Sequence, residues 1–145
     1  MNIPRLKFAL LICLLVIATP KFLPAGHSSD TFGPSLTPHR VDGVDACQAV
    51  AVAGNRLYAT GRGKFHVLDI TRPEKPVPLG ELSGLGNTRQ LFIKDNIAYI
   101  TARQDGLWLI DISDSSKPQL LSHYDTVEMA TGIWVSGSLA FVATR

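Results

Sequence analysis

The sequence is poor in the residues from which disulfide scaffolds and nucleic-acid surfaces are built. Its 145 residues include two cysteines, Cys13 and Cys47. Cys13 lies in an N-terminal leader, so a processed chain keeps one cysteine and cannot form an internal disulfide. Basic and acidic residues number 14 and 12, and no segment clusters the basic residues that nucleic-acid binding requires. We expect no nucleic-acid partner, and Cys47 is either a small half-buried residue or an intermolecular bridge.

Motifs of catalytic and cofactor chemistry are also absent. No pair of histidines or cysteines has the spacing of a metal site, and the acidic residues do not follow the calcium-loop pattern. No Gly-x-Ser-x-Gly nucleophile elbow occurs. The segment Gly61-Arg62-Gly63-Lys64 lacks the preceding glycine and the following Ser or Thr of a phosphate-binding loop, so a hairpin turn explains it better. We expect no metal, no cofactor and no enzymatic activity.

Long apolar runs are missing, apart from one short run near the N-terminus. Residues 8–18 are apolar, Arg5 and Lys7 precede them, and Thr19-Pro20 follows. This pattern is typical of a secretory signal peptide, whereas a membrane span needs about 17 to 25 apolar residues. The sequence predicts a signal-peptide helix within residues 1–26 and a secreted, periplasmic or cell-surface protein. Cleavage would leave no permanent membrane span; an uncleaved signal anchor is the alternative.

Residues 27–43 join the leader to the rest of the chain. They are rich in Pro, Ser, Gly and Thr, a composition typical of a flexible linker. Residues 37–43 lie one repeat period before residues 78–84, so the linker alternatively contains one outer strand of a preceding repeat unit.

What the sequence does contain is an internal repeat of about 41 or 42 residues. Residues 50–60 return as 91–101 and again as 133–143, and residues 67–71 return as 109–113. Four short strands in a copy of about forty residues indicate a β-propeller blade. Residues 44–145 therefore contain two complete blades and part of a third.

The best-preserved copy predicts strands at residues 90–94, 97–102, 107–112 and 119–124. Asp95-Asn96 forms a two-residue hairpin turn, because both residue types tolerate positive φ. The two middle strands are apolar on both faces, so each sheet must be covered on both sides. A stack of sheets satisfies this requirement. Together with the leader, the chain is predicted to be all-β, an incomplete β-propeller of four-stranded antiparallel blades preceded by an N-terminal signal-peptide helix.

The ends of the third strands carry a recurring polar pair. Asp69 is followed by Thr71, and Asp111 by Ser113. We expect both aspartates to accept backbone N–H bonds where the chain leaves the strand.

Residues 109–114, with residues 98–101 before them and Lys117-Pro118 after them, resemble the LVIVD repeat. The family is named for an apolar run that ends in Asp, and its members resemble β-propellers of secreted or surface proteins of bacteria and archaea. The resemblance covers residues 44–145 and is weaker in the first copy, where Arg72-Pro73 replaces the usual Asp-Pro. It implies a fold and an exported location but no reaction, since the family has no agreed biochemical activity.

One polar regularity suggests a binding site. Arg62, Arg103 and Arg145 hold equivalent positions at the end of the second strand of each copy. Arginine suits planar carboxylates and phosphates, so recognition of an anion or acidic partner is one hypothesis; pairing with groups of a neighbouring turn is the other.

The sequence favours an exported, non-enzymatic module that binds or scaffolds protein or glycan ligands at the cell envelope. The alternative is that the chain is a fragment of a larger propeller protein and has no activity of its own. The larger protein could then be a channel-centred hydrolase or oxidoreductase. Since the last strands are as apolar as the interior ones, self-association through open blade edges is also considered.

Overall fold

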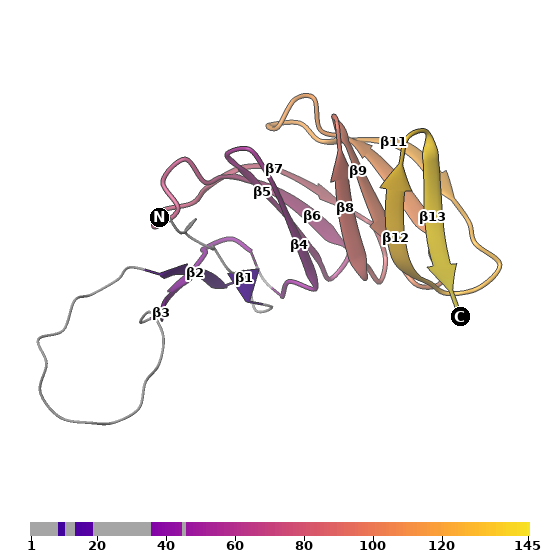
Figure 1. Ribbon diagram of the computed structural model, residues 1–145, viewed down its shortest axis with the longest axis horizontal. Coiled ribbons are helices and arrows are strands. Elements are labelled where there is room, and N and C mark those ends of the chain that lie inside the picture. The colour runs from indigo at the N-terminus through magenta and orange to yellow at the C-terminus, as the bar shows by residue number, and fades with distance from the viewer. Residues whose placement is uncertain (1–8, 11–13, 19–35, 45) are drawn as a thin grey trace, which may run out of the picture.

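The computed structural model describes residues 9–10, 14–18, 36–44 and 46–145, and within these residues it contains strands and no helix (Figure 1). The strands are β1 (Ala9–Leu10), β2 (Leu14–Ala18), β3 (Leu36–Arg40), β4 (Ala49–Ala53), β5 (Arg56–Gly61), β6 (Lys64–Asp69), β7 (Val77–Ser83), β8 (Gln90–Lys94), β9 (Ile97–Thr101), β10 (Leu107–Asp111), β11 (Gln119–Tyr124), β12 (Ala130–Ser136) and β13 (Leu139–Thr144).

From β4 onward the sheets follow the sequence repeat. Unit 1 is the sheet β4-β5-β6-β7, unit 2 is β8-β9-β10-β11, and unit 3 is the pair β12-β13; all neighbouring strands are antiparallel. The units stack face to face, and their first strands β4, β8 and β12 follow one another along the stack (Figure 1). This arrangement confirms the incomplete propeller of four-stranded blades that the repeat predicted.

The hairpin turns explain why the strands start and stop where they do. The first hairpin of each unit closes with two residues, and the leading turn residues Gly54, Asp95 and Gly137 have φ of 57°, 53° and 56°. These values are those of left-handed turns that match the twist of the paired strands. The predicted strands of unit 2 agree with the structure to within one residue at each end.

The core lies in layers between the units, and unit 2 is covered on both faces. Toward unit 1, Ala98, Ile100 and Ile110 are fully buried in a cluster with Phe65 and Val67 of unit 1. Toward unit 3, a second cluster joins the two units through the residues Leu107, Ile133 and Val135, with Phe92, Tyr99, Leu109 and Val142 packed against them. The apolar middle strands are thus buried on both sides, as their sequence requires.

The polar pairs at the ends of the third strands behave as predicted. Thr71 N donates to Asp69 Oδ1 at 2.7 Å, and Ser113 N donates to Asp111 Oδ1 at 2.8 Å. Hydrogen bonds from the hydroxyl and then the amide of Thr71 hold the pKa of Asp69 below its usual range. Ser113 lowers the pKa of Asp111 in the same way.

The segment before the units is extended where the structure describes it. The signal-peptide helix expected within residues 1–26 falls mostly on residues outside the described ranges, and it stays a prediction there. Within that region, β1 and β2 are strands rather than helix, because β2 pairs with β3 from Leu14↔Arg40 to Ala18↔Leu36. Across the described segments, no helix is long and apolar enough to cross a membrane.

The linker predicted at residues 27–43 also contains a described strand. β3 lies in it and pairs with β2, instead of extending a preceding unit within the described residues. Val41 and Val44, directly after β3, are 6% and 9% exposed and pack on unit 1 against a cluster with Leu57 and Leu68. The outer face of unit 1 is therefore covered by this short segment.

Candidate functional site

A hollow opens where the first strands of the units begin. Its volume is about 390 Å³, and the side chains that line it come from all three units: Cys47, Gln48, Arg89, Gln90, Thr131 and Arg145. Gln48 and Arg89 directly precede β4 and β8, and Thr131 lies at the start of β12. Since these three residues are one repeat period apart, each unit contributes the same position to one concave surface.

Backbone hydrogen bonds fix these positions. Gln48 N donates to Thr60 O and Arg89 N donates to Thr101 O, each at 2.7 Å. The two residues are therefore paired with equivalent residues of the second strand in their own units. Arg145 N donates to Met129 O at 3.2 Å, which places the end of β13 beside the start of β12. The hollow is therefore held by strand pairing.

Several lining side chains already have hydrogen-bond partners. Gln90 Oε1 accepts from Ile133 N at 2.8 Å, a contact between units 2 and 3. Thr131 Oγ1 donates to Ala143 O at 3.2 Å, and Cys47 Sγ donates to Ala49 O at 3.3 Å. By contrast, Gln48 Oε1 is buried without a hydrogen bond from any described residue. Thr88 Oγ1, Arg103 Nε and Trp108 Nε1, which lie outside the hollow, are also buried without a described partner, so this atom by itself does not mark a ligand site.

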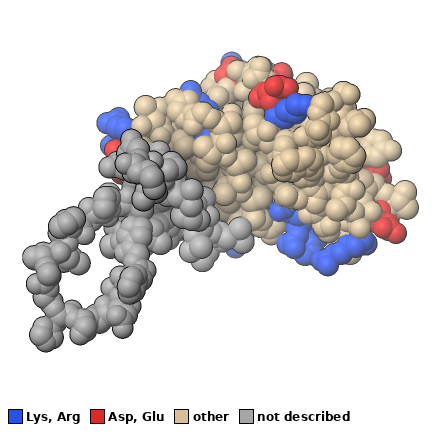
Figure 2. All heavy atoms as spheres, in the orientation of Figure 1, with Lys and Arg blue, Asp and Glu red and all other residues tan. Residues whose placement is uncertain are grey.

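The hollow is positively charged. Its lining includes two arginines and, among the described residues, no aspartate or glutamate. Figure 2 shows Lys and Arg side chains gathered at the lower margin of the molecule, beneath the starts of β8 and β12, with acidic side chains beside them at the right-hand margin and others along the top. Neither Arg89 nor Arg145 forms a hydrogen bond or ion pair through its guanidinium group within the described part of the chain.

The structure separates the three arginines that the repeat singled out. Arg145 lines the hollow, whereas Arg62 and Arg103 do not. Arg62 has φ of 50° and, with Gly63 at 73°, forms the two-residue turn between β5 and β6. Arg103 has φ of 39°, and its backbone exchanges hydrogen bonds of 3.0 and 2.9 Å with Ala130 at the start of β12. Recognition of a ligand by all three arginines stays a prediction.

Sequence reasoning missed Arg89, together with the glutamines and threonine of the hollow. The signal that would have found them is variation within the repeat. Where most repeat positions carry similar residues, the position directly at the start of the first strand carries Gln48, Arg89 and Thr131 in turn. That difference has significance only once the three positions are known to meet.

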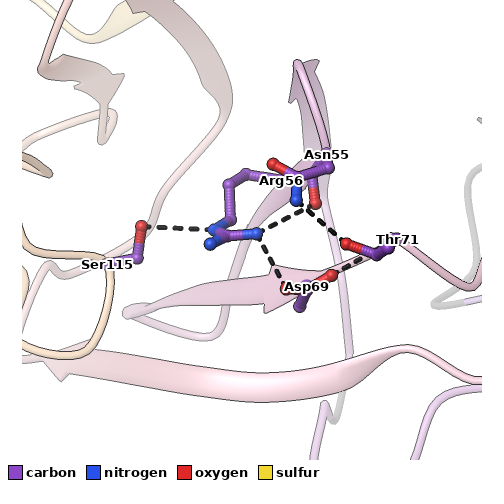
Figure 3. A network of polar contacts seen from close by, with 5 residues as sticks. All are labelled: Asn55, Arg56, Asp69, Thr71 and Ser115. Carbon is purple, nitrogen blue, oxygen red and sulfur yellow. Dashed lines mark hydrogen bonds and ion pairs between the residues drawn. The ribbon is translucent and has the colours of Figure 1, made fainter.

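A second polar cluster lies at the far ends of β4 and β6, and it is built from paired groups (Figure 3). Arg56 Nη1 lies 2.8 Å from Asp69 Oδ2, and Arg56 Nε donates to Ser115 Oγ of unit 2 at 3.4 Å. Asn55 Nδ2 donates to Thr71 Oγ1 at 2.9 Å. Because its members bind one another, this cluster joins units 1 and 2 and leaves little capacity for a ligand.

The histidines of the units have local partners. His66 is 7% exposed, and its Nδ1 lies 3.3 Å from Glu81 Oε2. The ring of His123 stacks on Trp108 with centroids 3.8 Å apart and planes at 14°. In the described part of the protein, no group of three or more His, Cys, Asp or Glu side chains has the arrangement of a metal site.

Comparison with known proteins agrees with this architecture. The family model of the LVIVD repeat matches residues 85–126 and 128–145, so units 2 and 3 are similar to LVIVD repeats. Unit 1 lies outside the matched residues yet forms the same four-stranded sheet. Its register shift between Val67 and Leu68 corresponds to that between Leu109 and Ile110 in unit 2.

The crystal structure of the computationally designed Ika8 protein is similar to this chain, with a TM-score of 0.60 and 19% sequence identity. The match covers 72% of this chain and 32% of the Ika8 chain, so the chain spans about a third of the length of that protein. At this identity the similarity shows the fold alone. No curated protein matches the chain.

Proposed function

We propose that this chain of LVIVD repeats is an exported, non-enzymatic binding module, and that a protein or glycan ligand binds in the hollow at the starts of β4, β8 and β12. The supporting observation is that three units place different side chains, Gln48, Arg89 and Thr131, at one equivalent position around a shared surface. A rigid framework that presents variable side chains is the usual construction of a recognition surface.

The chemistry of the hollow supports binding over catalysis. Its described lining consists of two guanidinium groups, two amides, a hydroxyl and a thiol. General acid–base catalysis relies mostly on histidine or a carboxylate with a pKa near the working pH. The groups present are instead suited to holding a polar ligand by hydrogen bonds.

A triple substitution tests this function. Gln48, Arg89 and Thr131 are replaced by alanine, and the matched control replaces Arg72, Glu74 and Lys75, three exposed residues of the loop between β6 and β7. Both variants and the wild type are screened against glycan and peptide arrays after equal thermal stability has been verified. Ligands that the control retains and the hollow variant loses support the proposal. Ligands that both variants retain, or arrays on which the wild type binds nothing, contradict it.

Export is proposed from the leader pattern in residues 1–26. Its test is to express the chain with a C-terminal tag, to separate cytoplasm from envelope and medium, and to sequence the N-terminus of the product. A product without the leader outside the cytoplasm agrees with export. A full-length cytoplasmic product contradicts it.

A second candidate function, as part of a larger propeller or assembly, is favoured by the outer face of unit 3. On this face Trp134, Leu139 and Phe141 are 63%, 61% and 55% exposed. The equivalent residues of unit 2, Phe92, Ile97 and Tyr99, are half-buried, and Phe92 and Tyr99 pack against the cluster shared with unit 3. The face that receives unit 3 on unit 2 is thus repeated on unit 3, where it fits another blade of the same type. Such a blade would come from a longer protein of which this chain is a part, for example a hydrolase or an oxidoreductase, or from a second copy of this chain.

The assembly candidate is tested by light scattering at increasing protein concentration. We expect the wild type to self-associate and the variant Trp134→Ser with Phe141→Ser to do so less. The matched control changes Leu120 and Leu121 of β11, which are 50% and 51% exposed, to serine. A wild type that stays a monodisperse monomer contradicts self-association, and an equal effect of the control contradicts the assignment to unit 3.

A further inference from the structure

We infer that the hollow recognises a carboxylate of an acidic polypeptide segment, bound between the guanidinium groups of Arg89 and Arg145. This inference rests on the proposed binding function and assigns it a ligand class. Three observations carry it: the charge of the hollow, the direction of its unused hydrogen-bond capacity, and its size and lining.

The first observation is uncompensated charge in a concave site. Arg56 shows how this chain holds an arginine for structural purposes, since its guanidinium group lies 2.8 Å from the Asp69 carboxylate. Arg89 and Arg145 have no such partner among the described residues. The nearby carboxylate of Glu128 accepts from the hydroxyl of Thr144 at 3.3 Å and does not line the hollow. Both guanidinium groups therefore keep hydrogen-bond donors that no described residue occupies.

The second observation is that the hydrogen-bond groups left over are mainly donors. Arginine has only N–H donors. The carbonyl oxygen of Gln90 is occupied by Ile133 N, so the group that Gln90 has left is its NH₂. The carbonyl oxygen of Gln48 is buried, so it offers the hollow no accessible acceptor. Donors that converge on one concavity select an oxyanion, and the planar fork of arginine pairs with a carboxylate through two parallel hydrogen bonds.

The third observation distinguishes ligand classes. A volume of about 390 Å³ is at the lower end of ligand sites and has room for a side chain together with its backbone. No aromatic residue is among the described side chains that line it, so a sugar ring would have no flat apolar surface to stack on. A peptide carboxylate needs none, because charge-assisted hydrogen bonds supply its affinity.

The test measures fluorescence anisotropy of a labelled tetra-aspartate peptide against the full chain. The matched probe is the tetra-asparagine peptide, and tetra-glucuronate and inorganic phosphate are used as competitors. Variants are Arg89→Gln and Arg145→Gln, with Arg72→Gln as the control, because Arg72 is an exposed arginine of the loop between β6 and β7. We expect each hollow variant to weaken aspartate binding about 10-fold, which is the scale of one lost hydrogen bond to a charged group. We expect Arg72→Gln to change it little and added salt to weaken it.

Equal binding of the asparagine peptide, or an equal loss in Arg72→Gln, overturns the inference. Stronger binding of tetra-glucuronate or phosphate than of the peptide overturns the polypeptide assignment and gives the site to a glycan or a phosphate ligand. If the arrays identify a ligand that depends on the hollow while none of these probes binds, the carboxylate inference is wrong and the binding function stands. If no ligand depends on the hollow in either experiment, both are wrong.

Discussion

Phe92 and Trp134 hold the same position in units 2 and 3, and their rings meet edge to face, with centroids 5.0 Å apart and planes at 65°. The repeat thus places two equivalent aromatic residues in contact across the boundary between units. Trp134 contacts the preceding unit and still leaves most of its own surface exposed. The contact joins β8 to β12, as does the hydrogen bond from Ile133 N to Gln90 Oε1.

A double-mutant cycle measures this link. Replacing Phe92 and Trp134 by alanine, singly and together, is expected to reveal a coupling of about 1 kcal/mol, the usual value for such an aromatic pair. The free energies of unfolding come from urea titrations. The control cycle pairs Phe92 with Tyr124, which is 68% exposed on β11, and is expected to give no coupling. Equal coupling in the two cycles would show that the rings do not interact specifically.

Gly80 is predicted to be intolerant of any side chain. A Cβ atom there would lie 2.6 Å from Ser115 O and 2.8 Å from Pro118 Cδ, because β7 of unit 1 packs closely on the loop between β10 and β11 of unit 2. We expect Gly80→Ala to lower the free energy of unfolding by about 1–3 kcal/mol through overpacking. Ser83→Ala, at the exposed end of the same strand, is the control in the same urea titrations. A Gly80→Ala protein as stable as the control would mean that the two units are farther apart.

Arg62→Gly is expected to stabilise the protein. Arg62 has φ of 50°, a left-handed conformation that costs a residue with a Cβ about 1–2 kcal/mol and costs glycine almost nothing. The gain is about 1 kcal/mol or less, since glycine also adds entropy to the unfolded chain. Melting temperature is the measurement, and Arg72→Gly, at a residue without positive φ, is expected to be neutral or destabilising. A lower melting temperature for Arg62→Gly would point to a stabilising role of the arginine side chain.

Acid is expected to weaken the turns that follow β6 and β10. The folded-state pKa values of Asp69 and Asp111 are lowered from 3.8 by Thr71 and Ser113. A depressed carboxyl pKa contributes stability that is complete above the unfolded value and is lost as the pH falls through the folded value. Melting temperature should therefore be steady with respect to these groups above about pH 5 and fall below about pH 4. In Asp69→Asn with Asp111→Asn the fall should be smaller; an unchanged fall would assign it to other carboxylates.

The strands could be predicted from the sequence because the repeat encodes them locally. Two-residue turns such as Asp95-Asn96 and apolar strands such as residues 97–101 carry their own signals, and the structure places them where the pattern did. The order of the units also follows from the repeat. These features depend on neighbouring residues, so one copy is enough to recognise them.

The hollow could not be predicted in the same way. It exists because Gln48, Arg89 and Arg145 come together from three units, and residues so far apart in sequence leave no local signal. Sequence reasoning selected arginines that repeat, whereas the structure places an arginine that does not repeat, Arg89, beside Arg145. The contact of Gln90 with Ile133 N depends likewise on how the units stack.

The burial of Val41 and Val44 gives the stack two unlike ends. At one end these valines cover the sheet, whereas at the other Trp134, Leu139 and Phe141 present bare apolar surface. We expect a further unit to bind on the exposed face of β12 and β13, whereas binding beside unit 1 would first require the segment that contains Val41 and Val44 to detach. Detachment of that segment would expose the apolar face of unit 1 that it covers.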